Sequence, residues 1–233
     1  EVPNPENKEA LSMGSALAEK VKADVVFGTD PDCDRLGVAI RNDNGEFVSL
    51  TGNQVGVLLS DYIIYRLKEE NKLPSNAVIV KSFVSSGLVV PVAKHNVVEV
   101  VDVPVGFKFI GEKIKQYEKT KEKEFIFGFE ESCGYLRGTH ARDKDAVVAS
   151  MLFAEMVCFY NYKNITVFKR LNSIYENFGY AAEKTVSIKY DGVNAMAEMN
   201  AVVDSLKGKY VPKFAGYTVR EVRDYSTATA ITC

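Results

Sequence analysis

Three aspartates at alternate positions are the feature of this sequence with the clearest chemical meaning. Residues 28–35 read GTDPDCDR, so Asp30, Asp32 and Asp34 directly follow the apolar run ADVVF, and Arg35 closes the set. Alternate side chains of an extended segment point the same way, which predicts that the three carboxylates converge. Converging carboxylates need a cation, and oxygen ligands suit Mg²⁺ or Ca²⁺. We expect Mg²⁺, with coordination positions left for a substrate phosphate.

Other interpretations of this acidic segment differ in strength. An EF-hand loop also opens D-x-D-x-D, but it needs Gly at its sixth position and Glu at its twelfth, where this chain has Arg35 and Arg41. A phosphatase that uses Asp30 or Asp32 as nucleophile, with the other as acid, stays open. So does a solvated acidic loop that caps a helix or turn. Arg35 either forms a weak surface ion pair with these carboxylates or uses its planar guanidinium to bind a phosphate or sugar oxygen.

A second cluster lies in the segment GFEESCGYLRG, directly after the apolar residues FIF. Glu130, Glu131 and Ser132 stand there between glycines, which let the backbone approach a ligand closely. Carboxylates and a hydroxyl can bind the vicinal hydroxyls of a sugar. The alternative is an ordinary turn after a strand, with exposed glutamates.

A third cluster, THARDKDAVVASML, brings His140, Arg142, Asp143, Lys144 and Asp145 to the start of a predicted helix. The two aspartates there suit the helix start, so we expect them to be caps. Lys144 opposes the helix dipole, which favours an anionic ligand or proton transfer as its role. We also assign Arg142 to substrate binding.

A further loop, DVPVGFKFIGEKI, places Gly106, Phe107 and Lys108 between a strand and a helix. A glycine turn at a helix start can bind an anion, and Lys108 would strengthen such a site. A plain helix entry with a packed Phe107 explains the same residues equally well.

The elements that position these clusters alternate along the chain. Val/Ile/Phe-rich strands are expected near residues 22–27, 76–84, 97–103 and 124–130, with helices around 11–21, 51–74, 107–119 and 144–160 and a hairpin over 35–50. Continuous apolar strands separated by helices predict an α/β fold with a mixed, mainly parallel layered sheet. Ligands of such sheets collect beyond the carboxyl ends of strands, where all these loops fall.

The pattern changes beyond about residue 162. An amphipathic helix over 164–180, an alternating strand at KTVSIKY, another helix and the segment TVREVRDY indicate a partial α+β unit. We therefore divide the chain into residues 1–50, 51–162 and 163–233.

Composition limits the classes of function. The chain has 233 residues, 46% hydrophobic residues and a net charge of −2, so no global field attracts nucleic acid or a membrane surface. Its four cysteines are widely spaced, and no apolar stretch suits a transmembrane span or signal peptide. We expect a soluble cytoplasmic protein.

Taken together and in order, the four motifs and the opening PNPE resemble the α-D-phosphohexomutase superfamily, the phosphoglucomutases and phosphomannomutases. GFEES and ARDKD look closer to the bacterial phosphoglucomutases. The resemblance implies a four-domain isomerase that moves a phosphoryl group between a phosphoserine and hexose phosphates, through a hexose bisphosphate. Its roles map onto this chain as follows: Asp30, Asp32 and Asp34 for Mg²⁺, Arg35 for the reacting phosphate, Glu130 and Ser132 for the sugar, Lys144 for proton transfer, and Gly106 and Lys108 in another ligand-facing loop.

The chain departs from the family pattern in two places. It has no Ser-His-Asn-Pro segment for the phosphoserine and no Arg-x-Ser-Gly-Thr segment for the distal phosphate. The expectation is a fragment: 1–50 is the end of domain two, 51–162 is domain three, and 163–233 is a connector with the start of domain four. Such a fragment is expected to be inactive alone, and a noncatalytic module that binds a sugar phosphate stays open as an alternative. Its incomplete domain two would expose apolar surface, which favours a homodimer or contact with the missing domains.

Overall fold

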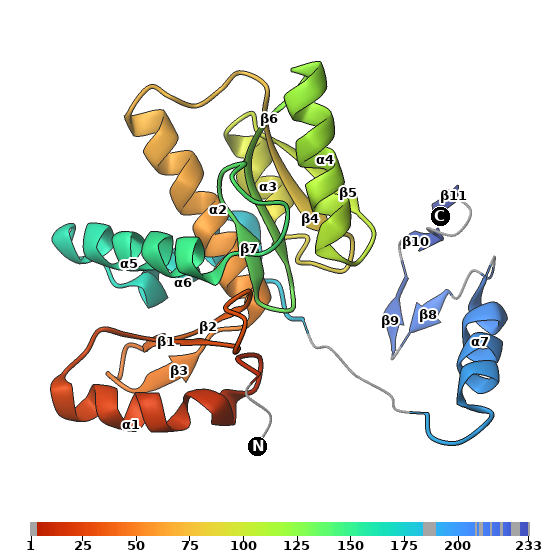
Figure 1. The fold of residues 1–233 in the computed structure, drawn as a ribbon, viewed down its shortest axis with the longest axis horizontal. Helices are drawn as coiled ribbons and strands as arrows, with labels where there is room; N and C mark the ends of the chain where they lie inside the picture. The colour runs from red at the N-terminus through yellow and green to blue at the C-terminus, as the bar shows by residue number, and fades with distance from the viewer. Residues whose placement is uncertain are drawn as a thin grey trace. The chain divides into compact units, whose positions relative to one another are not determined.

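The computed structural model describes residues 4–183, 190–207, 209, 212–214, 216–219, 221–224 and 229–232. The chain divides into two compact units, Glu1–Glu183 and Lys184–Cys233 (Figure 1). The first unit contains all the loops that the sequence assigns to chemistry. Each unit is described by itself.

The first unit begins with a short antiparallel sheet backed by a helix. The 3-10 turn η1 (Lys8–Leu11) leads into α1 (Ser12–Val21), and β1 (Val25–Thr29), β2 (Leu36–Arg41) and β3 (Phe47–Ser49) pair in that order. The hairpin predicted around NDNG is confirmed, with Gly45 at φ 82° in the turn. The acidic segment is therefore the connection between two neighbouring antiparallel strands.

A second, mixed sheet follows. Its elements are α2 (Gly52–Glu69), β4 (Ala77–Ser82), α3 (Val89–His95), β5 (Glu99–Val103), α4 (Phe107–Thr120), β6 (Glu124–Glu130) and β7 (Gly134–Leu136). The strand order is β5-β4-β6-β7, with β4, β5 and β6 parallel and β7 antiparallel to β6. The predicted mainly parallel sheet is confirmed; the three-residue strand β7 was not predicted.

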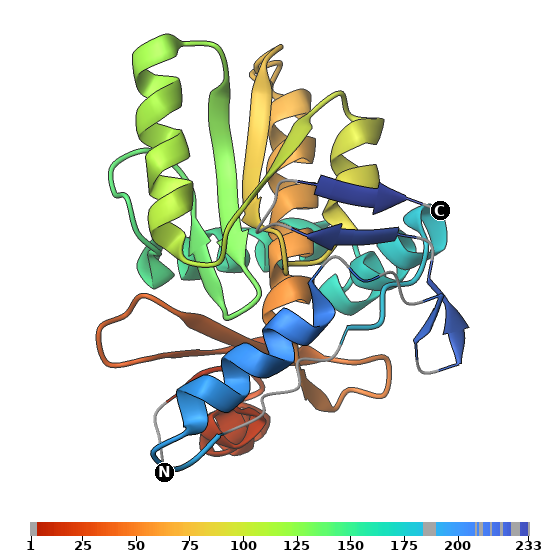
Figure 2. The same cartoon turned by 90° about the vertical axis from the view of Figure 1, so that its right-hand side faces the viewer.

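Helices cover both faces of this sheet (Figure 2). On β4, Val78 and Val80 pack toward α4, in a core that includes Ile110 and Ile114. The alternate residue Ile79 belongs to the larger core on the opposite face, which α2, α3 and α5 (Ala146–Tyr162) complete. A strand that is buried on both faces needs apolar side chains at successive positions, which explains the continuous apolar runs of this sheet.

Helix α6 (Val167–Phe178) packs into the core of the first unit through Val167, Leu171 and Ile174. Its Arg170 also forms a bidentate pair with buried Asp61 of α2, at 2.8 Å from Nε to Oδ2 and 2.6 Å from Nη2 to Oδ1. The boundary placed at residue 162 stays a prediction, but the helix that follows it is part of the first compact unit.

The second unit contains α7 (Ala195–Leu206) and the strands β8 (Lys213–Phe214), β9 (Tyr217–Thr218), β10 (Glu221–Asp224) and β11 (Thr229–Thr232). β8 pairs with β9, and β10 pairs with β11, both antiparallel. A helix with antiparallel strands agrees with the expected α+β unit. Six of the seven residues of the strand predicted at KTVSIKY lie outside the described residues.

Within the described parts of the chain, no helix combines the length and apolar character needed to cross a lipid bilayer. The cytoplasmic location stays a prediction.

Candidate functional site

The acidic loop lies against the loops that follow β6 and precede α5. The backbone N–H of Leu36 donates to the carbonyl of Cys133 at 2.9 Å, and the N–H of Ala146 donates to the carbonyl of Cys33 at 3.1 Å. Arg35 and Gly134 form an isolated antiparallel bridge. These backbone bonds join the two sheets at the carboxyl end of β6, so three of the predicted loops meet at one edge.

The acidic loop is a turn, and the extended segment predicted from the sequence is wrong. Cys33 has φ 58°, and its N–H donates to the carbonyl of Asp30 at 3.0 Å. The carboxylate of Asp30 accepts the N–H groups of Asp34, at 3.1 Å, and Arg35, at 3.0 Å, through Oδ1. The convergence is nevertheless present, since one oxygen from each of Asp30, Asp32 and Asp34 lies within 4.8 Å of the others.

The two carboxyl groups that line the interior of this loop differ in pKa. Burial acts to raise the pKa of Asp30, but the N–H groups of Arg35 and Asp34 outweigh it and lower that pKa. Burial raises the pKa of Asp34, and the nearby Asp30 carboxylate adds to the increase, although Lys144 opposes it. The arrangement thus concentrates negative charge that a cation would relieve.

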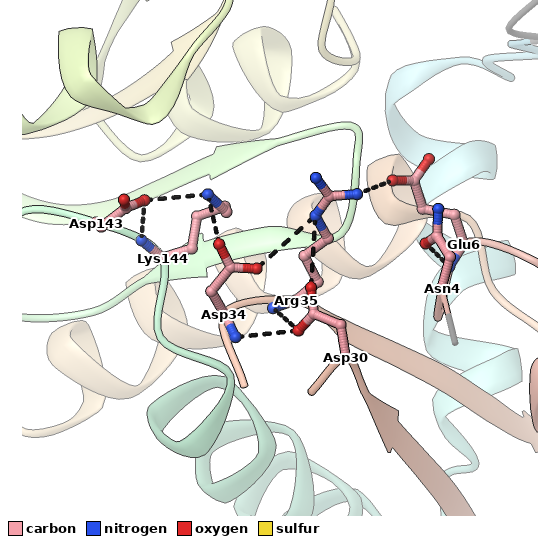
Figure 3. Close-up of polar contacts among 7 residues, drawn as sticks. All are labelled: Asn4, Glu6, Asp30, Asp34, Arg35, Asp143 and Lys144. Carbon is pink, nitrogen blue, oxygen red and sulfur yellow. Dashed lines mark hydrogen bonds and ion pairs between the residues drawn. The ribbon is translucent and has the colours of Figure 1, made fainter. Parts of the chain in front are cut away.

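Arg35 lies between the acidic carboxylates and Glu6 (Figure 3). Its Nη1 donates to Glu6 Oε1 at 2.8 Å, while its Nε stands 3.7 Å from both Asp30 Oδ2 and Asp34 Oδ1, beyond hydrogen-bonding distance. Among the described residues, the Nε of Arg35 and the Oδ1 of Asp34 are buried without a hydrogen-bond partner. An unsatisfied oxygen on Asp34, together with the convergence of the Asp30, Asp32 and Asp34 carboxylates, suits a hard divalent cation, so the residues present fit Mg²⁺.

Lys144 reaches the same cluster from the loop before α5. Its ammonium lies 2.8 Å from Asp34 Oδ2 and 3.1 Å from Asp143 Oδ1, with 14% of the side chain exposed. Burial acts to lower its pKa, but Asp34 and Asp143 outweigh burial and raise it. The side chain crosses Gly134, where a Cβ would lie 2.2 Å from the Cδ of Lys144. The glycine after the glutamates therefore provides the space in which this cation reaches the acidic loop.

Glu130 ends β6 as a buried side chain, 5% exposed, and accepts the N–H of Gly106 at 2.6 Å through Oε1. Burial raises its pKa, although the Gly106 N–H opposes this. Gly106 has φ 118° and is the N-cap residue, directly before α4. Its N–H is thus bonded to Glu130 instead of being free for an anion. Lys108 is exposed, with its ammonium 4.9 Å from the centre of the Phe109 ring.

The neighbouring Glu131 makes a different set of contacts. Its Oε2 accepts the hydroxyls of Ser82, at 2.9 Å, and Ser85, at 3.2 Å, both of which follow β4. Ser132 lies half-buried next to it. Glu131 therefore anchors the predicted sugar loop to the residues after β4. The sequence does not predict this contact, because the serines lie 49 and 46 positions away.

Like Lys108, Arg142 is a predicted site residue for which the structure shows no contact with this cluster. Its Nη1 donates to the carbonyl of Thr139 at 2.6 Å, and its Nη2 pairs with Glu118 of α4. Asp145 is the predicted cap: its carboxylate accepts the N–H of Val148 at 3.0 Å at the start of α5. Glu6 was not predicted, because nothing local in PNPE indicates a partner 29 positions away.

We expect Gly52→Ala to destabilise the sugar loop. A Cβ there would lie 2.0 Å from the carbonyl oxygen of Glu131 and 2.8 Å from the backbone N of Cys133. Backbone atoms cannot move aside without disturbing the loop. The expected loss is about 1 to 3 kcal/mol in the free energy of unfolding, measured with urea. Gly87→Ala is the matched control, since nothing lies within 4 Å of its Cβ. Equal stability of the two variants would contradict this packing.

Comparison with known proteins gives consistent matches. The models for phosphoglucomutase/phosphomannomutase α/β/α domain III and domain II match residues 51–178 and 1–45. Phosphoglucomutases of Staphylococcus saprophyticus and Staphylococcus aureus (strain USA300) are each 33% identical over 96% and 97% of this chain. The chain spans 40% of the length of each.

Solved structures show the same fold. A putative phosphomannomutase from Thermus thermophilus superposes with a TM-score of 0.59 at 23% identity, over 76% of this chain and 36% of that one. The phosphoglucomutase parafusin from Paramecium superposes with a TM-score of 0.57 at 19% identity, over 99% of this chain and 39% of that one.

Proposed function

Because this chain belongs to the phosphoglucomutase/phosphomannomutase family, we propose that it supplies the metal-binding and sugar-binding loops of an enzyme that interconverts hexose 1-phosphate and hexose 6-phosphate. The observation that carries the proposal is the meeting of the acidic loop with Lys144 and the end of β6 at one edge of the sheet. The ligands are then a hexose phosphate and its bisphosphate.

The acidic loop would bind the metal through Asp30, Asp32 and Asp34. Bound there, Mg²⁺ would neutralise charge on the oxygens of the transferred phosphoryl group. Arg35, which Glu6 orients, presents a planar guanidinium toward the same region and would position the phosphate.

Lys144 would act beside the metal loop as the proton-carrying group. Its raised pKa keeps it protonated near neutral pH, so it can hold a phosphate oxygen or give a proton to an oxygen that loses its phosphoryl group. A substrate anion that displaces Lys144 from Asp34 would free that carboxylate for the metal.

The Glu130→Gln variant is expected to weaken sugar-phosphate binding without lowering stability. Burial raises the pKa of Glu130 in the folded chain above its unfolded value, so between these two pKa values the unfolded state binds fewer protons, and stability falls as pH rises through the folded pKa. Gln removes this charge and keeps an acceptor for Gly106. We expect at least wild-type stability at pH 7, a gain that shrinks as pH falls, and about tenfold weaker sugar-phosphate binding.

Urea unfolding across pH and calorimetry with glucose 1-phosphate measure the two effects. The exposed residue Glu112 of α4 provides the control variant, Glu112→Gln. Lower stability together with unchanged binding would show that Glu130 is structural.

Calorimetry with Mg²⁺ and glucose 1-phosphate, followed by a phosphate-release assay, tests the proposed function. We expect metal-dependent binding of the sugar phosphate. We expect neither sugar-phosphate interconversion nor phosphate release from the 233 residues alone, because they contain no Ser-His-Asn-Pro segment. Phosphate release that Asp30→Asn or Asp32→Asn abolishes would instead show a phosphatase. Absence of binding with Mg²⁺ present would overturn the proposal.

A further inference from the structure

Arg137 is a half-buried cation directly after β7, outside the site described above. A guanidinium carries five N–H donors and always needs acceptors or water for them. Among the residues that the structure describes, none accepts a hydrogen bond from Arg137 or forms an ion pair with it. Burial lowers the pKa of Arg137, and the charge of the Glu124 carboxylate only partly offsets this.

Arg137 lines a cavity of about 460 Å³. Asn76, before β4, and Glu124, the first residue of β6, also line it, as do Lys121, Lys123 and Thr139. β6 runs from Glu124 to Glu130, so the cavity lies at the amino end of this strand and the acidic-loop site at its carboxyl end. The two sites are therefore at opposite ends of the sheet.

The other charged groups of the cavity are already paired in part. Glu118 pairs with Arg142, and Lys123 pairs with Glu99 of β5. The amide of Asn76 donates to the carbonyls of Lys121 and Glu122.

The groups left for a ligand are two cations, two hydroxyls and one carboxylate. Within the described part of the chain, the guanidinium of Arg137, the ammonium of Lys121 and the hydroxyls of Tyr117 and Thr139 make no side-chain hydrogen bond. Glu124 is the carboxylate of the cavity that has no ion pair with a described residue.

We propose that this cavity binds a small molecule through an oxyanion, a phosphate ester or a carboxylate, held by Arg137 with Lys121 as the second cation. A planar guanidinium binds such groups with two parallel hydrogen bonds, and a half-buried one gains more than an exposed one because it is already partly desolvated. The volume accommodates a phosphorylated or carboxylated metabolite. The site is independent of the proposed mutase chemistry.

The test is a titration of the ¹⁵N-labelled chain with inorganic phosphate and, separately, citrate, followed by NMR. We expect saturable shifts of the amides of Gly138, Thr139 and Lys121, and at least tenfold weaker binding in Arg137→Met. Arg137→Lys, which keeps the charge but loses the planar fork, should fall between. Lys119→Met, exposed on α4, is the matched control.

The amides of Asp34 and Gly106 report phosphate binding at the acidic-loop site in the same spectra, so failure of one proposal is distinguishable from failure of the other. Saturable shifts with inorganic phosphate alone would identify the bound group as a phosphate, and shifts with citrate alone would identify it as a carboxylate. No saturable shift near Arg137 with either probe, or equal affinity in Arg137→Met and the wild type, would overturn the inference.

Discussion

Replacing Asp32 with Asn is expected to weaken Mg²⁺ binding at least about 100-fold and to leave the fold unchanged. Removal of a residue that hydrogen-bonds to a metal ligand already lowers metal affinity about 10- to 100-fold. Removal of a carboxylate ligand itself should lower the affinity by no less. Asp32 is exposed, and its side chain makes no hydrogen bond to another described residue, whereas Asp30 holds the turn through two backbone N–H groups. Asp32 is thus the aspartate that can be changed without collapsing the loop.

Calorimetric titration with Mg²⁺ measures this effect, and circular dichroism checks the fold. Asp43→Asn, an exposed aspartate in the turn between β2 and β3, is the matched control and should bind Mg²⁺ like the wild type. Equal affinity of Asp32→Asn and Asp43→Asn would show that Asp32 is not a ligand.

Arg170→Met is expected to cause the largest loss of stability, about 3 to 5 kcal/mol. Asp61 is 6% exposed and accepts two hydrogen bonds from Arg170, and Tyr160 adds a longer one at 3.4 Å. Removing the guanidinium leaves a buried carboxylate without its cation, which costs more than the pair itself contributes.

Urea unfolding measures this loss, with Lys169→Met as the control, because Lys169 is the exposed neighbour on α6. The double variant Asp61→Leu/Arg170→Met should recover most of the stability, since it removes both charges. A single variant as stable as the control would mean that α6 is not anchored in the first unit through Arg170.

The sequence predicted those features that depend on local pattern. Apolar runs such as EFIFGFE are too continuous for a strand with one face in solvent. They therefore predicted strands that are buried on both faces and a sheet that is covered by helices. The same pattern placed Asp30 and Glu130 immediately after strands, and the carboxyl ends of strands are where such a fold gathers its ligand loops.

Features that depend on distant contacts could not be predicted in this way. Period-two spacing suggested an extended acidic loop, but Cys33 adopts a left-handed conformation and Asp30 closes a turn. The partners of Glu131 and Arg35 lie 29 to 49 positions away. The substrate role of Arg142 stays a prediction, but its ion pair with Glu118 of α4, 24 positions away, could not be predicted from its neighbours in sequence.

The central claim, that the acidic loop holds a divalent cation, is tested most directly by titrating the ¹⁵N-labelled chain with Mn²⁺ and following paramagnetic broadening by NMR. We expect the amides of residues 30–35, Gly134 and Lys144 to broaden first, and excess Mg²⁺ to restore them. Broadening that begins at other acidic surfaces, such as Glu69 and Glu70, and that leaves residues 30–35 sharp would contradict the claim.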